Sequence, residues 1–260
     1  MIVQIYEVQT PSEAEPLIEL GTDHIGSVIL SEASWKISSI RDTVRMAAAA
    51  GCRSSLIPLF STPDTIFHML DYYQPDIIHF CETLADQDGT LKNCKDLADL
   101  QKNVKKNFPE IRIMRSIPIA QPGKADLMPS LEAARIFEPI SDYFLTDTFL
   151  VNPPSQAVAS EDSDQPVSGF VGITGLTCDW DIATKLVEMS SIPVILAGGI
   201  SPDNVSDGIR HVRPAGVDSC TGTNALDKEG RPIRFKKDFD KVKYLIETVR
   251  NLKLPVVRCN

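Results

Sequence analysis

Glycines and small polar residues in the C-terminal third of the chain have the types and spacing of a phosphate-binding site. Gly198 and Gly199 directly follow residues 192–196, a largely β-branched apolar run that is typical of a buried strand. Ser201 and Pro202 then stand where the N-cap and the first residue of a helix are expected. Glycine turns and helix starts present backbone N–H groups that bind phosphate, so this stretch predicts a phosphorylated ligand.

A second turn of small polar residues follows the next short predicted strand, residues 216–217. It contains Asp218, Thr221 and Gly222. In a β/α barrel, the phosphate site lies after strands seven and eight, which is where these two turns would fall. The alternative for the two glycines at 198 and 199 is a plain tight turn with no ligand.

The elements that would position these residues alternate along the whole chain. The predicted strands are residues 2–8, 24–30, 54–60, 76–80, 111–117, 143–146, 192–196 and 216–217. The predicted helices are residues 10–20, 38–50, 62–73, 94–107, 131–137, 179–190, 202–212 and 238–251. Eight such units predict an α/β protein with a single (β/α)₈ TIM barrel domain over residues 1–260. An open, doubly wound sheet is the alternative.

Two segments stand outside this pattern. Residues 148–177 form an enlarged loop after strand six, which is either a lid over the site or an insertion. Its acidic run, Glu161–Asp164, is interpreted as a solvated surface rather than a metal site, because no ligand spacing supports a metal. Residues 226–234 are predicted to be a further loop.

Composition and charge narrow the class of function. The 260 residues are 43% hydrophobic and 23% charged, which is the balance of a globular protein. The net charge of −9 argues against nucleic acid or an anionic membrane as the main partner. The six cysteines form no CxxC pair, and no apolar run approaches the ~20 residues that cross a bilayer. A cytoplasmic protein is therefore expected.

Candidate catalytic residues are the polar side chains at the C-terminal ends of the predicted strands, because active sites of β/α barrels lie there. They are Tyr6, Glu7, Ser31, Glu32, Trp35, Lys36, His79, Cys81, Glu82, Arg115, Asp147, Thr174, Gly175, Thr177, Asp218, Ser219, Cys220 and Thr221. In a regular strand Glu7 faces away from the side that Tyr6 faces, so Glu7 reaches the site only if the strand ends at Tyr6.

Several of these segments together resemble the phosphoribosylanthranilate isomerase family of tryptophan biosynthesis. The stretch LAGGISPDNV…VRPAGVDSCTG is similar to that family's LAGGLxPxNV…xRPxGVDxSSG. GITGLTCDW, Gly172–Trp180, resembles GGTGxTFDW, and DYFLTDT, Asp142–Thr148, resembles the family's sixth strand. The first helix and second strand, and the closing helix, resemble the family too, so most of the chain is covered in the right order.

The resemblance implies an Amadori rearrangement of N-(5-phosphoribosyl)anthranilate to its 1-deoxyribulose form, without a metal or an organic cofactor. It implies that Asp147 is the general acid that opens the ribose ring. It also implies a site for the small phosphorylated substrate, built from Gly175, Gly198, Gly199, Asp218, Thr221 and Gly222.

At two positions the chain departs from the family's pattern. The general-base cysteine of the family's KICG sequence falls on Tyr6, within Gln4-Ile5-Tyr6-Glu7. The substrate-binding arginine of its KSPR sequence falls on Trp35, which could stack on an aromatic ligand or cover a hydrophobic edge. Tyrosine is a poor base at neutral pH because its usual pKa is about 10. His79 and Cys81 are therefore the candidates for a relocated base.

Three functions follow from these observations. The first is an isomerase of the phosphoribosylanthranilate type with Asp147 as acid and an unusual base. The second is an enzyme of the same fold that acts on a different phosphorylated sugar or amine, and the third is a non-catalytic protein that binds a phosphorylated ligand. The sequence leaves open whether the chain is a monomer or a homodimer.

Overall fold

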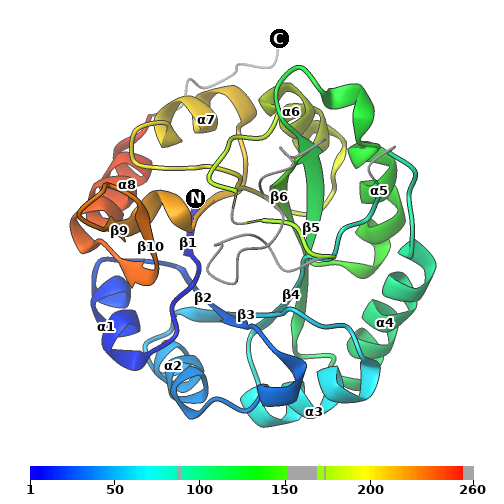
Figure 1. Cartoon of the computed structure of the whole chain (residues 1–260), viewed down its shortest axis with the longest axis horizontal. Helices are drawn as coiled ribbons and strands as arrows, with labels where there is room; N and C mark the ends of the chain where they lie inside the picture. Colours follow the sequence, from blue (N-terminus) through cyan, green and yellow to red (C-terminus); the bar gives the residue numbers. More distant parts are fainter. Residues whose placement is uncertain (87–88, 151–168, 173, 254–260) are drawn as a thin grey trace.

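A closed barrel of parallel strands forms the centre of the computed structural model, which describes residues 1–86, 89–150, 169–172 and 174–253 (Figure 1). The barrel strands are β1 (Ile2–Ile5), β2 (His24–Ile29), β3 (Arg53–Pro58), β4 (Ile77–Phe80), β5 (Arg112–Ala120), β6 (Tyr143–Phe149), β7 (Val194–Leu196) and β8 (Gly216–Ser219). Because β1 pairs with both β2 and β8, the sheet has no edge. The predicted TIM barrel is confirmed, and the open sheet is excluded.

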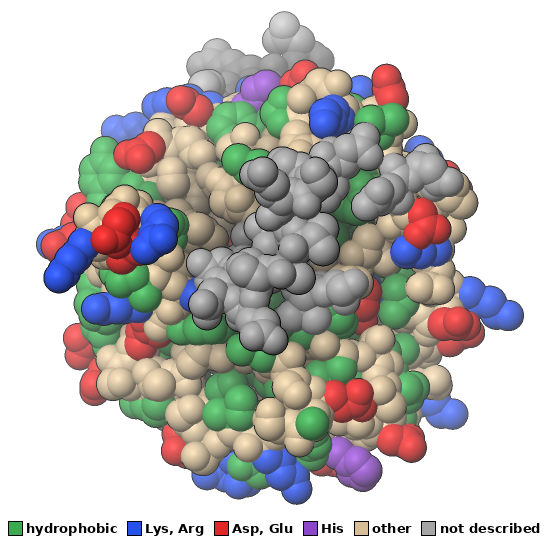
Figure 2. All heavy atoms as spheres, in the orientation of Figure 1, with side chains coloured by type: hydrophobic (Ala, Val, Ile, Leu, Met, Phe, Trp, Pro, Cys, Tyr) green, Lys and Arg blue, Asp and Glu red, His purple; other side chains and the backbone are tan. Residues whose placement is uncertain are grey.

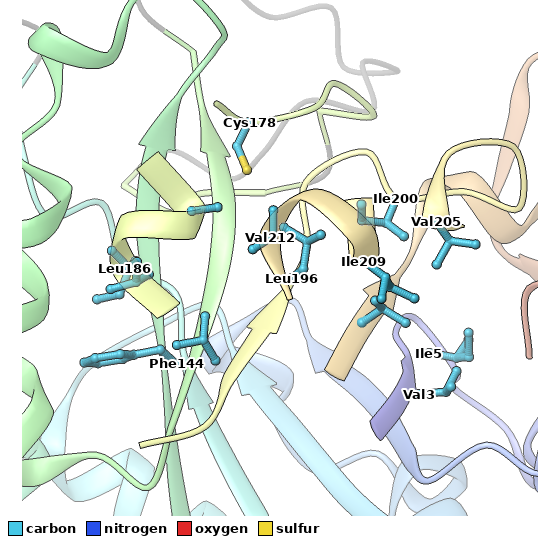
Figure 3. Close-up of a cluster of buried hydrophobic side chains, with 14 of the residues drawn as sticks. Val3, Ile5, Phe144, Cys178, Leu186, Leu196, Ile200, Val205, Ile209 and Val212 are labelled. Carbon is cyan, nitrogen blue, oxygen red and sulfur yellow. The ribbon is translucent and has the colours of Figure 1, made fainter. Parts of the chain in front are cut away.

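Helices surround this barrel on all sides (Figure 1). They are α1 (Pro11–Glu19), α2 (Ser38–Ala49), α3 (Pro63–Tyr73), α4 (Cys94–Asn107), α5 (Ser130–Phe137), α6 (Trp180–Met189), α7 (Val205–Val212) and α8 (Phe239–Asn251). Their apolar faces pack on the outer face of the strands. In Figure 3, Leu196 of β7 lies among Ile209 and Val212 of α7, within one cluster of buried side chains.

The inside of the barrel is partly polar, and strand register explains which side chains meet there. Gln4 of β1 is paired with His24 of β2 on one side and with Asp218 of β8 on the other. The Gln4 side chain donates from Nε2 to Asp218 Oδ1 at 3.2 Å, and its Oε1 lies 2.9 Å from His24 Nδ1. Asp218 is therefore held from within the barrel.

Three local predictions are corrected by the structure. The first strand ends at Ile5 rather than Val8. Helix α7 begins at Val205 with Asn204 as N-cap, three residues after the predicted start, because the Asn204 side chain bridges Ser201 N–H and the Gly199 carbonyl. The predicted loop after strand eight is a hairpin of β9 (Asn224–Leu226) and β10 (Pro232–Lys237).

The predicted long loop after strand six falls mainly on residues that the structure does not describe. Residues 151–168, including the acidic run, and residue 173 lie outside the described ranges. In the described part of the chain, no helix is long and apolar enough to cross a membrane.

Candidate active site

One cavity at the C-terminal ends of the barrel strands brings together residues from seven of the eight strands, all except β5. The predicted acid, two candidates at the family's base position or for a relocated base, and the predicted phosphate-site residues line it: Asp147, Tyr6, His79, Gly175, Gly198, Gly199, Asp218, Thr221 and Gly222. Glu7, Cys81 and Cys220 line it as well. The position matches that of barrel active sites.

Glycines at one side of this cavity allow three loops to pack closely. Gly198 and Gly199 have φ values of 83° and 63°, a region that residues with a side chain rarely adopt. A Cβ on Gly199 would lie 2.6 Å from the backbone carbon of Leu176, and one on Gly222 would lie 2.4 Å from the Ile200 carbonyl oxygen. The loops after β6, β7 and β8 therefore meet backbone to backbone, as a phosphate cradle requires.

Asp147 has the environment of a proton donor. It lies in β6, and burial raises the pKa of its carboxyl to about 7, although its Oδ1 accepts a hydrogen bond from the Thr148 N–H at 2.9 Å. Gly172 leaves room beside the carboxyl, because a Cβ there would lie 2.7 Å from Asp147 Oδ2. A carboxyl with a pKa near the working pH can donate a proton and take it back.

Asp218 is a second carboxyl of the cavity with a similar shift. Burial is the main cause that raises its pKa to about 7, and the nearby Asp147 raises it further, while the hydrogen bond from Gln4 opposes the shift. Because Gln4 holds Asp218 Oδ1 from inside the barrel, this carboxyl is fixed in place.

Tyr6 and His79 belong to a chain of hydrogen bonds below the cavity. The Tyr6 hydroxyl lies 2.6 Å from Ser55 Oγ and 2.7 Å from His79 Nδ1, and His79 Nε2 lies 2.8 Å from Ser116 Oγ. Burial raises the Tyr6 pKa well above its usual value and lowers that of His79 to about 3, so both side chains are neutral near pH 7. Their polar atoms already have protein partners, which does not favour either as a base.

Two thiols of the cavity are also held in the neutral form. Burial raises the pKa of Cys81 well above its usual value, and Glu82 and Asp147 add to the shift. Burial likewise raises the pKa of Cys220 well above its usual value, against the opposing charge of Lys237. Neither thiol is a good proton acceptor at neutral pH, because the thiolate is the basic form.

Glu7 lines the cavity because the first strand ends before it, which is the condition that the sequence set for this residue. The strand ends at Ile5, and Glu7 itself has a φ of 64°, which turns its side chain toward the cavity instead of away from it. The Glu7 side chain is 1% exposed, and Arg234 of β10 donates from Nε to its Oε1 at 2.6 Å. The hairpin thus brings a cation to the end of β1.

Comparison with known proteins shows which proteins this chain is similar to. The model of the N-(5'-phosphoribosyl)anthranilate (PRA) isomerase family matches residues 141–247, from the start of β6 into α8. "N-(5'-phosphoribosyl)anthranilate isomerase 2" of Methanosarcina mazei is 36% identical over 55% of this chain and 57% of its own length. An isomerase of Methanocella arvoryzae is 26% identical over 95% of this chain and 97% of its own. Residues 141–247 are thus similar to the PRA isomerase family, and nearly the whole chain is similar to individual PRA isomerases.

Solved structures of PRA isomerases have the same fold. That of Thermotoga maritima has a TM-score of 0.64 at 19% identity and covers 97% of this chain and 100% of the other. That of Pyrococcus furiosus has a TM-score of 0.63 at 19% identity with the same coverage. At this identity the likeness concerns the barrel and not the details of the site.

Trp35, predicted to bind the substrate, does not line the cavity. The candidates Ser31, Glu32, Lys36, Glu82, Thr177 and Ser219 do not line it either. Trp35 lies at the end of a short 3₁₀ turn before α2, and its ring is 5.7 Å from that of Tyr72 and 6.4 Å from that of Tyr73, both on α3. The Trp35 carbonyl accepts a hydrogen bond from the Tyr73 hydroxyl at 2.6 Å. Relative to the PRA isomerase pattern, the arginine position is thus occupied by a residue that covers the edge between α2 and α3.

Arg115 also lies away from the cavity. It is fully buried outside the barrel, where it donates to Gln101 Oε1 at 2.6 Å and to Glu82 Oε2 at 2.5 Å. Its neighbours Met114 and Ser116 face the other way, as period-two alternation in β5 requires. A structural role for Arg115 follows from these contacts.

Metal binding finds no support in the described residues. No group of three or more His, Cys, Asp or Glu side chains in that part of the chain could hold an ion. The five cysteines that the structure describes are all free thiols.

Proposed function

We propose that this chain isomerises N-(5'-phosphoribosyl)anthranilate by an Amadori rearrangement. One observation carries the proposal: a buried carboxyl, Asp147, with its pKa raised to about 7, lines the same cavity as the glycine turns after β7 and β8. A phosphate bound at those turns would leave the sugar within reach of the acid. The choice of substrate is based on the names of the relatives, which are N-(5'-phosphoribosyl)anthranilate isomerases.

In the proposed reaction the protein holds the substrate and moves protons. The backbone N–H groups at Gly198, Gly199 and Gly222 bind the phosphate. Asp147 then protonates the ring oxygen of the ribose, and the C1–O bond breaks while the amine nitrogen forms a protonated Schiff base. A base removes the proton from C2, and the enolamine becomes the ketone. Each step is a proton transfer, so the reaction needs no redox or organic cofactor.

A different phosphorylated sugar or amine as substrate is the second candidate. It is favoured by Tyr6 and Trp35, which stand where the family has its base and its arginine. The phosphate turns and Asp147 would serve such a substrate equally well. We propose that the protein works in the cytoplasm, where such phosphorylated metabolites are found.

The test is turnover of N-(5'-phosphoribosyl)anthranilate by the purified chain, together with growth of a tryptophan auxotroph that lacks the isomerase. We expect product formation in vitro and growth without tryptophan when the chain is expressed. Soluble, folded protein that neither forms product nor restores growth would reject the isomerase and leave the second candidate.

Tyr6→Phe is expected to keep most of the activity and to lose stability. The variant removes a hydroxyl that contacts Ser55 and His79, and leaves His79 Nδ1 without its partner. An unsatisfied buried group costs about 1–3 kcal/mol, whereas a lost general base lowers kcat by about 10²–10⁴-fold. Urea unfolding and steady-state kinetics distinguish the two roles. A fall in kcat of this size in a protein with unchanged unfolding would instead make Tyr6 the base.

A further inference from the structure

Glu7 has a backbone conformation that points to a function. Its φ of 64° lies in the left-handed region, which a glutamate adopts only when the surroundings impose it. The chain is bonded to its neighbours on both sides of this residue: Tyr6 N–H donates to the Ser219 carbonyl, and Val8 N–H donates to the Gly26 carbonyl. The kink is therefore fixed by the barrel and turns the side chain toward the cavity.

The carboxylate of Glu7 has one oxygen engaged and one oxygen available. Arg234 donates from Nε to Oε1 at 2.6 Å. Oε2 is buried and has no hydrogen-bond partner among the residues that the structure describes. The neutral Cys220 thiol lies beside this carboxylate, because a hydrogen bond with Glu7 contributes to the raised pKa of Cys220. A buried carboxylate oxygen with so few donors is costly, which suits it to accept a proton from a ligand in the cavity.

The hairpin of β9 and β10 holds Arg234 in place. The guanidinium lies 4.7 Å from the centre of the Phe235 ring. At the base of the hairpin, the backbone N–H of Lys237 donates to Glu13 Oε1 of α1 at 2.6 Å, and its Nζ donates to the Cys220 carbonyl at 3.0 Å. The hairpin thus lies beside α1 and β1 (Figure 1), and acidic and basic side chains gather at its exposed end (Figure 2), where Arg231 and Glu229 form an ion pair.

The order of strands in the barrel places Glu7 opposite the acid. Strands β6, β7, β8 and β1 follow one another around the ring. Asp147 lies on β6 and Glu7 follows β1, so the glycine turns after β7 and β8 stand between them. A sugar phosphate anchored at those turns would have one carboxyl on each side.

We propose that Glu7 is the general base of this enzyme and that Arg234 is a positioning residue that orients its carboxylate. The proposal rests on the isomerase function above. Glu7 is one residue after Tyr6, which stands at the family's cysteine position. The kink after β1 brings the Glu7 side chain to the cavity.

Among the described residues, six other ionisable side chains line the cavity. Tyr6 and His79 are hydrogen-bonded within the protein, and Cys81 and Cys220 are neutral thiols. Asp147 is the proposed acid, and Asp218 is held by Gln4.

The proton transfers balance. Asp147 gives a proton to the ring oxygen as the Schiff base forms. Glu7 takes the proton from C2, and the C–H electron pair forms the C1=C2 double bond while the C1=N pair returns to nitrogen. Protonated Glu7 then returns the proton to C1, and the hydroxyl on C2 gives its proton to Asp147 as the ketone forms. Both carboxyls end in the state in which they began.

Two variants of Glu7 test the proposal in the full chain. Glu7→Gln keeps the size of the side chain, and Glu7→Gly suits the left-handed backbone and leaves space for a small carboxylate. We expect kcat to fall by about 10²–10⁴-fold in both, with the Kd for inorganic phosphate unchanged. Formate is expected to restore part of the activity of Glu7→Gly. Gln74→Gly is the matched control, because Gln74 has a φ of 50° at an exposed site after α3.

Arg234 is tested by the same kinetics. Arg234→Gln is expected to lower kcat by about 10- to 100-fold without weakening phosphate binding, and Arg234→Lys is expected to recover part of that loss. Full activity of Glu7→Gln would overturn the proposal while the isomerase function stands. A loss in Glu7→Gly that formate does not relieve would also overturn it, and an inactive parent protein would overturn both.

Discussion

Replacing Asp147 with asparagine is expected to reduce kcat by at least about 10³-fold. Asparagine has nearly the same shape but has no proton to give to the ribose oxygen, and general acids contribute about 10²–10⁴-fold to such steps. The side chain lies in the cavity that holds the glycine turns. Steady-state kinetics on purified protein gives the measurement, with Asp181→Asn as the control, because Asp181 is exposed on α6.

The pH dependence of the parent protein follows from the same carboxyl. Burial raises the pKa of Asp147 to about 7, and the protonated form is the acid. Activity that depends on this acid is therefore present below pH 7 and is lost as pH rises through about 7. A parent profile that stays flat from pH 6 to 9, with unfolding unchanged over that range, would contradict the assignment.

Stability provides an independent readout for Asp147→Asn. Because the pKa of this carboxyl is raised from 3.8 to about 7 in the folded protein, its contribution to stability is full below pH 3.8, is lost as pH rises to about 7, and does not change further above that. Asparagine stays neutral, so at pH 8 the variant is expected to be at least as stable as the parent. Loss of activity without loss of stability would show that Asp147 serves the reaction and not the fold.

The barrel could be predicted from the sequence because its signals are local. Each strand is an apolar run and each helix an amphipathic one, so eight repeats of the pattern define the topology. The glycine turns could be predicted for the same reason. Gly198, Gly199 and Gly222 have positions that follow directly from where β7 and β8 end.

Glu7 could be named as a candidate from the sequence, but its kink and its surroundings could not be predicted because they depend on contacts between distant segments. Tyr6 packs flat over Gly26, where a Cβ would lie 2.1 Å from the ring. This contact turns Tyr6 into the barrel, and the chain then kinks at Glu7. Arg234 comes to Glu7 from 227 residues along the chain. No local pattern relates these positions, and the hairpin that carries Arg234 resembles a charged loop in the sequence.

The position of Trp35 also depends on a contact between distant segments and could not be predicted from the local sequence. Its alignment with the family's arginine suggested a role beside the substrate, but the aromatic side chains of α3 offer it a partner at 5.7 Å. Among the described residues that line the cavity there is no arginine or lysine. Arg234, from the β9–β10 hairpin, is the cation that forms an ion pair with Glu7.

Gly199→Ala is expected to raise KM and the Kd for inorganic phosphate by about 10²-fold. The new Cβ would lie 2.6–2.8 Å from backbone atoms of Leu176 and Thr177, so one of the two loops has to move. Because these loops form the proposed phosphate cradle, the displacement removes backbone N–H groups from the ligand. A loss of two or three such contacts, at about 1–1.5 kcal/mol each, corresponds to this factor.

Gly51→Ala separates the loss of the cradle from backbone strain. Gly51 has a φ of 73°, close to the 63° of Gly199, but a Cβ there would meet no atom within 4 Å. It lies between α2 and β3, at the opposite end of the barrel from the cavity. Both variants are expected to lose about 1–2 kcal/mol of stability from the left-handed backbone, and only Gly199→Ala is expected to lose phosphate affinity. Equal phosphate affinity in the two variants would place the phosphate somewhere other than the turn after β7.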